Sequence, residues 1–195
     1  MDFFMLANQK YRQGKVNYYN SIIPPETGKN IVLQAVQAQS DHRIHNTTRR
    51  LISSLYNEAS VATLENSKIA SLSARLSEIQ AIYNEVQKKI KYTYDPHKTE
   101  LVYHPSFLYD NAFSKKKKWA EDCDTIALLT LTYLLSLGYK SRVTIVGFPS
   151  TPGFAHVFAE AFIPELSRWL VIDPALGVKS KPMVKRIVRF QHFYP

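Results

Sequence analysis

The only cysteine of the chain, Cys123, stands between two aspartates where a polar stretch gives way to a long apolar run. Residues 126–137 are apolar apart from two threonines and a serine, which predicts a helix buried on nearly all sides. Asp122 and Asp124 are residues of the kind that cap a helix N-terminus. A thiol at that place feels the positive end of the helix dipole and faces free N–H groups. The segment therefore predicts a cysteine at the start of a central helix.

After this helix the apolar residues change from a helical period to a period of two. We predict strands at 141–148, 156–163 and 168–172, separated by turns at 150–153 and 164–167, with a last strand at 183–190. Upstream we predict a loop at 21–28, helices at 30–38, 41–58 and 71–91, an extended segment at 92–96, and then a loop that reaches residue 118. Helices followed by a run of strands indicate an α+β fold with an antiparallel sheet.

Two residues downstream could complete a nucleophilic site with Cys123. His156 stands at the start of a predicted strand, and Asp173 ends another, just before Pro174. Cysteine, histidine and aspartate in this order are the parts of a nucleophilic triad. Each also has an ordinary interpretation, because a lone cysteine is often a small buried hydrophobe, a strand histidine is often structural, and Asp-Pro can simply begin a turn.

Length and composition set broad limits on the chain. Its 195 residues suffice for one sizeable core, and we expect N-terminal leader and helices at 1–70 and a cysteine-nucleophile domain at 71–195. One cysteine excludes an intramolecular disulfide framework. The N-terminus lacks the features of a signal peptide, and no apolar run is long enough to span a bilayer. We expect a soluble protein that is cytoplasmic or associated with a virus particle.

The net charge of +9 admits a polyanionic partner such as nucleic acid. The only clusters of basic residues are 115–118 and 179–189, and no nucleic-acid-binding signature is present. A solvated basic surface is the simpler interpretation, although 115–118 could also cover the cleft. His42 and His45 share one predicted helix without further ligands, so we expect no metal site.

Three local sequences together resemble the transglutaminase-like superfamily, whose members share a papain-like core. The first is Asp122-Cys123-Asp124 followed by an apolar helix and Leu137-Gly138 with Arg142. The second is His156-Val157-Phe158-Ala159-Glu160, and the third is Trp169-Leu170-Val171-Ile172-Asp173-Pro174. The similarity runs from about residue 122 to 174, and a looser one upstream is to small family members of phage and prophage gene clusters.

The resemblance implies that the central helix packs on an antiparallel sheet with extra N-terminal helices around it. It makes Cys123 the nucleophile, His156 the general base and acid, and Asp173 the residue that orients the imidazole. The Cys123 backbone N–H would serve an oxyanion hole, with Trp119 as a candidate second donor. Glu121 departs from the family pattern, which usually has glycine there and so leaves more room beside the nucleophile.

We therefore expect thiol-dependent acyl chemistry on an amide bond of a protein or peptide, without a cofactor. Hydrolysis by a cysteine peptidase or amidase is favoured over transglutaminase-like acyl transfer, because no amine-acceptor site is evident. The alternative is a non-catalytic structural or assembly component, for instance of a phage particle, that retains the fold.

Overall fold

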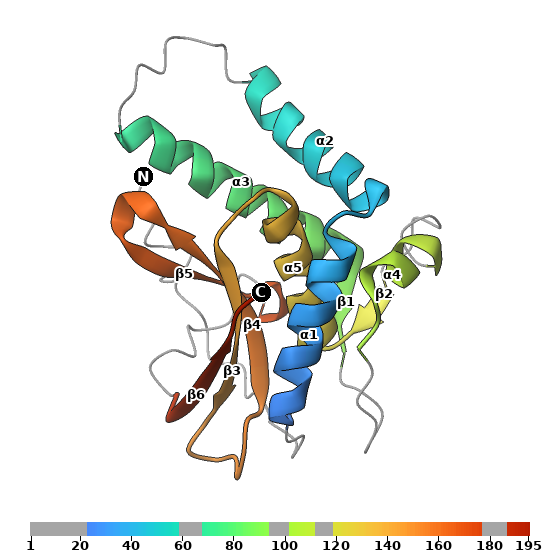
Figure 1. The fold of residues 1–195 in the computed structure, drawn as a ribbon, viewed down its shortest axis with the longest axis vertical. Coiled ribbons are helices and arrows are strands. Elements are labelled where there is room, and N and C mark those ends of the chain that lie inside the picture. Colours follow the sequence, from blue (N-terminus) through green and yellow to red (C-terminus); the bar gives the residue numbers. More distant parts are fainter. Residues whose placement is uncertain (1–22, 59–67, 94–101, 112–118, 177–186) are drawn as a thin grey trace.

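The computed structural model describes residues 23–58, 68–93, 102–111, 119–176 and 187–195 (Figure 1). Its α-helices are α1 (Pro25–Ala38), α2 (His42–Glu58), α3 (Lys68–Lys89), α4 (Pro105–Asn111) and α5 (Cys123–Ser136), with short 3₁₀ turns η3 (Pro164–Leu166) and η4 (Pro174–Leu176). Its strands are β1 (Ile90–Tyr92), β2 (Trp119–Glu121), β3 (Ser141–Gly147), β4 (His156–Ile163), β5 (Arg168–Ile172) and β6 (Arg189–Phe193). None of the helices in these ranges is long and apolar enough to cross a membrane.

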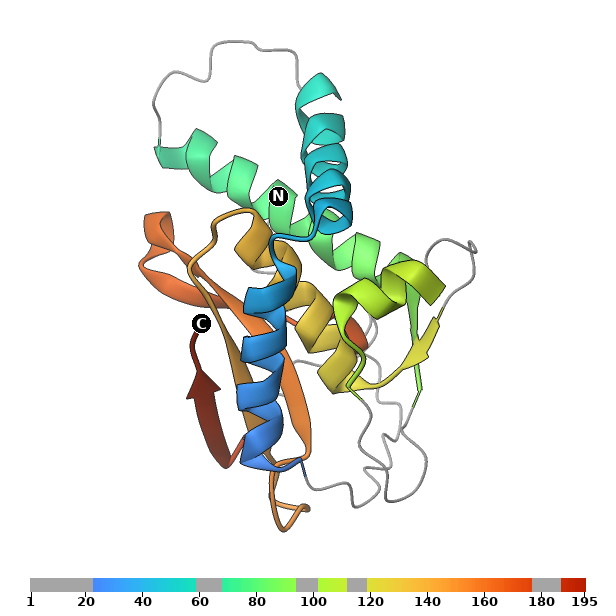
Figure 2. The ribbon, with the colours of Figure 1, turned by 45° about the vertical axis from the view of Figure 1, so that its right-hand side comes forward.

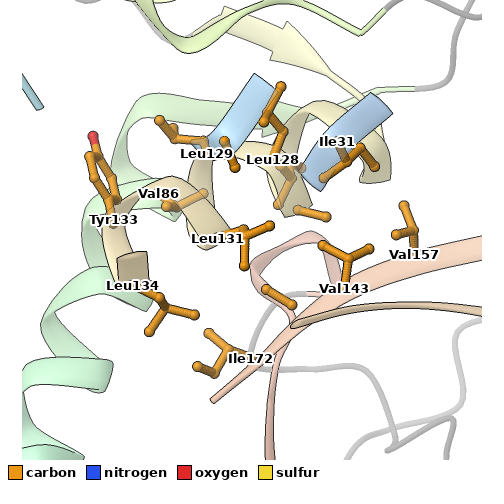
Figure 3. Packing of buried hydrophobic residues seen from close by; sticks show 14 of the residues in the cluster. Ile31, Val86, Leu128, Leu129, Leu131, Tyr133, Leu134, Val143, Val157 and Ile172 are labelled. Atoms are coloured by element: carbon orange, nitrogen blue, oxygen red, sulfur yellow. The ribbon is translucent and has the colours of Figure 1, made fainter. Parts of the chain in front are cut away.

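Helix α5 forms the centre of the core, as the sequence predicts. Every residue from Cys123 to Leu134 is buried, and the helix packs on β4 as well as on α1, α2 and α3. Figure 3 shows Leu128, Leu131 and Leu134 among side chains from the sheet and the other helices. The buried Thr130 and Thr132 of α5 donate their hydroxyls to carbonyls one turn earlier, so these hydroxyls are satisfied without leaving the core.

The larger sheet has the strand order β5-β4-β3-β6, and all its neighbours are antiparallel. Alternate residues such as Val143, Ile145 and Val157 face the core beneath α5. Helix α1 packs on α5 and on the same side of β3 and β6, as Figures 1 and 2 show. The α+β class, the central helix and the antiparallel sheet are confirmed.

Several predicted boundaries are wrong. Residues 25–28, predicted as loop, form the first turn of α1, because proline is well tolerated at a first helical position. The helix predicted at 71–91 begins at Lys68 and ends at Lys89, since 90–92 pair in parallel with 119–121 as a small second sheet. The loop predicted after residue 96 contains α4.

The last strand also lies elsewhere, at Arg189–Phe193 and not at 183–190, and residues 183–186 fall outside the described ranges. The leader at 1–22 and the basic residues 115–118 fall outside them too. Two predicted helix ends are confirmed. Asp41 accepts a hydrogen bond from the Arg43 N–H at the start of α2, and Gly138 adopts the positive φ of 75° after α5.

Candidate active site

The hydrogen bonds that cap the first turn of α5 leave one backbone N–H group without an acceptor among the described residues. The Asp122 side chain accepts from the Asp124 N–H at 3.3 Å, and the Asp124 side chain accepts from the Thr125 N–H at 2.9 Å. The Ile126 N–H donates to the Asp122 carbonyl. Within the described residues the Cys123 N–H has no such partner, so it can bind an oxygen placed beside the sulfur.

His156 and Asp173 form a hydrogen bond at the ends of two neighbouring strands. The distance from His156 Nε2 to Asp173 Oδ2 is 2.6 Å, and both side chains are buried. The other Asp173 oxygen accepts from the Ala175 N–H in η4 at 3.2 Å, which fixes the carboxyl group. A carboxylate only accepts hydrogen bonds, so Nε2 carries the proton. In the neutral imidazole Nδ1 is then the unprotonated nitrogen.

The Cys123 sulfur lies against the strand that carries His156. It accepts a hydrogen bond from the Val157 backbone N–H, and Asp173 is close enough to act on it electrostatically. Strand β5 stops at Ile172, opposite Ala159, so it offers no partner to the Val157 N–H. The fold thus brings together the elements that bear Cys123, His156 and Asp173.

Burial raises the pKa of the Cys123 thiol well above its ordinary value, and Asp122, Asp124 and Asp173 raise it further. The hydrogen bond from Val157 acts in the opposite direction but is a smaller effect. Cys123 is only 6% exposed. In this conformation the sulfur is therefore a neutral thiol, and any thiolate must form by transfer of its proton to a nearby base.

The residues that precede the cysteine form a second layer of contacts. The Trp119 indole N–H donates to the carboxylate of Glu121, which is buried, and the Glu121 carbonyl accepts from Thr93 at 2.8 Å. Trp119 also makes edge contacts with Tyr103 and Phe107, which stack on each other. Trp119 remains a predicted oxyanion donor, and to serve as one its indole must leave Glu121.

The sequence did not predict the contacts that hold these groups. The Val157 N–H and the Ala175 N–H are backbone donors, and the type of residue does not indicate which contact such a group makes. Only Pro174, a turn former after Asp173, indicated that the Ala175 N–H could turn toward the carboxylate. Tyr103 and Phe107 lay in a segment predicted as loop. No group of three or more His, Cys, Asp or Glu side chains suited to a metal is present in the ranges that the structure covers.

Comparison with known proteins gives the family. The sequence profile of the transglutaminase-like superfamily matches residues 62–174, which is more than half of the chain and includes Cys123, His156 and Asp173. The chain belongs to the transglutaminase-like superfamily. This confirms the resemblance to this superfamily and its transglutaminase-like α+β core, and the likeness to phage and prophage members stays a prediction.

Two further comparisons add little to this assignment. A crystal structure from Cytophaga hutchinsonii, provisionally described as a cysteine protease, matches 96% of this chain and 56% of its own with 13% identity and a TM-score of 0.45. The chain thus spans just over half the length of that protein. No curated protein matches the chain.

Proposed function

We propose that this member of the transglutaminase-like superfamily is an enzyme that cleaves an amide bond through a Cys123–His156–Asp173 triad. The hydrogen bond from His156 Nε2 to Asp173 is the observation that carries the proposal. It leaves Nδ1 as the basic nitrogen, on the strand whose next N–H contacts the Cys123 sulfur. A histidine base held in one tautomer by a carboxylate, on an element that adjoins the thiol, supports the assignment of an activated nucleophile.

In the first half-reaction His156 Nδ1 takes the thiol proton while the Cys123 sulfur bonds to the substrate carbonyl carbon. The carbonyl oxygen becomes an oxyanion beside the Cys123 N–H, which α5 leaves without a partner among the described residues. The intermediate collapses with cleavage of the C–N bond, and the imidazolium gives its proton to the departing amine. A thioester on Cys123 and a neutral His156 remain.

In the second half-reaction His156 takes a proton from water, whose oxygen attacks the thioester. Collapse releases a carboxylic acid and returns the proton to the sulfur. An amine in place of water would give a new amide by the same steps, which is acyl transfer. Hydrolysis is our proposal because it needs only the groups named here.

The test uses p-nitrophenyl acetate as a generic acyl donor, since the natural substrate is not known. We expect a burst of nitrophenol equal to the enzyme concentration, and intact-mass spectrometry should place one acetyl group on Cys123. The matched variants Cys123→Ala and His156→Ala should abolish or strongly slow the burst. Addition of a primary amine then separates the two activities: unchanged product indicates hydrolysis, and amide formation with faster turnover indicates transfer.

A structural or assembly role is the second candidate. The burial of Cys123 and the raised pKa of its thiol favour it, as does the carboxylate of Glu121 close in sequence to the nucleophile. If folded protein shows no burst and its thiol resists alkylation, the enzymatic proposal is wrong and this second role is preferred.

A further inference from the structure

The last strand of the sheet carries a row of exposed apolar side chains. Val188, Phe190 and Tyr194 are 56%, 63% and 55% exposed, and with Leu33 they are the four most exposed large hydrophobic residues in the described ranges. Phe190 and Tyr194 stand at even-numbered positions with His192 between them, so they lie on one face of β6 and its C-terminal end, and Val188 directly precedes the strand. Exposed apolar side chains gathered on one short segment are a mark of an interaction surface.

Strand β6 is also an edge of the sheet, with β3 on one side and no strand of the described ranges on the other. Figures 1 and 2 both place it at the margin of the sheet. The N–H of Phe162 in β4 donates to the carbonyl of Lys140, which directly precedes β3. Because the backbone groups of successive residues alternate in direction along a strand, the even-numbered residues of β3 point their N–H and C=O groups toward β4. Odd-numbered residues of β3 then face β6 through 189, 191 and 193. The backbone groups of Phe190, His192 and Tyr194 therefore point away from the sheet.

This edge lacks the features that usually prevent pairing with another chain. Residues 189–193 contain no lysine, no proline and no acidic residue. The one full charge, on Arg189, is held by the carbonyls of Thr151 and Gly153 at 2.9 and 3.0 Å. Phe193 is buried against Gly28 of α1, so the strand has a fixed position. The edge is a ready template for one more strand.

We propose that β6 pairs with β6 of a second copy of this chain, antiparallel and about a two-fold axis, to form one continuous sheet. In the register centred on His192, each Phe190 lies opposite Tyr194 of the other copy, and all three outward-facing residues are paired. Aromatic cross-strand pairs stabilise antiparallel sheets. A second copy fits better than a charged partner because the outward row of Phe190, His192 and Tyr194 is aromatic and complementary to itself in this register.

The first test is sedimentation velocity of the full chain over a concentration series. We expect a reversible dimer that weakens at least tenfold in Phe190→Lys, whereas Leu33→Lys, at an equally exposed apolar position on α1, leaves it unchanged. Because each copy carries +9, added salt should strengthen the dimer by screening repulsion. A wild-type protein that stays monomeric at every concentration, or a dimer insensitive to Phe190→Lys, overturns the proposal.

A disulfide trap tests the register. In a Cys123→Ser background, the pair Phe190→Cys and Tyr194→Cys should give a covalent dimer under mild oxidation, because the two positions face each other across the axis. They are about 13 Å apart within one strand and cannot form a bond there. Phe190→Cys alone is the matched control and should cross-link far less. Equal cross-linking by the double and the single variant would refute this register.

If nucleic acid occupies the strand instead, added oligonucleotide should compete with the dimer and bind less tightly as salt rises, which also overturns the proposal.

Discussion

Removal of the Glu160 carboxylate should be among the more destabilising single changes in this sheet. Its side chain is 8% exposed and accepts from Arg142 Nε at 2.6 Å and from the Thr144 hydroxyl. Taking one partner from a buried ion pair costs about 3–5 kcal/mol, because the other charge is left without compensation. Arg142 would keep the Tyr194 hydroxyl at 2.9 Å and the Trp169 ring at 4.1 Å. We therefore expect the lower end, about 3 kcal/mol, for Glu160→Ala.

Urea unfolding followed by tryptophan fluorescence measures this loss of unfolding free energy. Glu160→Gln keeps the shape and an acceptor, so it should cost about 1–2 kcal/mol, the difference between charged and neutral hydrogen bonds. The double variant Arg142→Met/Glu160→Met removes both charges and should recover most of the loss. A loss below about 1 kcal/mol in Glu160→Ala would refute the reasoning, because the pair would then behave like an exposed surface pair.

Three other changes test separate parts of the account. Asp122→Asn keeps a good helix cap but removes a charge that raises the pKa of the Cys123 thiol, so alkylation of the thiol should begin at lower pH with stability nearly unchanged; an unshifted profile would contradict this. Gly28→Ala would place a Cβ 2.4 Å from the Phe193 ring and should lower the unfolding free energy by about 1–3 kcal/mol, whereas a gain would mean that the ring yields freely. A hydrogen bond from an α3 serine, together with an arginine of the same helix, lowers the pKa of Glu165 from 4.5 to about 2, so the stabilisation it gives is complete above pH 4.5 and is lost as the pH falls toward 2. Glu165→Gln should flatten that part of the stability curve in acid unfolding, and an equally steep curve would exclude this role.

The sequence predicted the elements whose periodicity extends over many residues. Helix α5 and strands β3, β4 and β5 were found because their apolar patterns are long and their ends carry Asp122, Gly138 or Pro164. The two three-residue strands β1 and β2 were not predicted, because three residues are too few to show an alternating pattern of apolar and polar side chains. Helix α4 was not predicted either, because its seven residues are too few to show a helical period.

The order of Cys123, His156 and Asp173 was enough to nominate them, but their geometry depends on tertiary contacts. His156 and Asp173 meet because β4 and β5, whose ends carry them, are neighbours in the sheet. The contact between the Cys123 sulfur and the Val157 N–H exists because β5 ends before it could pair there. Strand ends of this kind are set by packing of the whole sheet, which no local pattern contains.

The central claim is that His156 serves as the base for Cys123, and the pH dependence of iodoacetamide alkylation tests it most directly. We predict that the wild-type thiol reacts near pH 7 and that His156→Ala reacts about 100-fold or more slowly there, the usual contribution of a general base. Without His156 the buried thiol should react only at alkaline pH, because its pKa is raised, whereas the same cysteine unfolded in urea should titrate near 8.5. Identical profiles for folded wild type and His156→Ala would contradict the account.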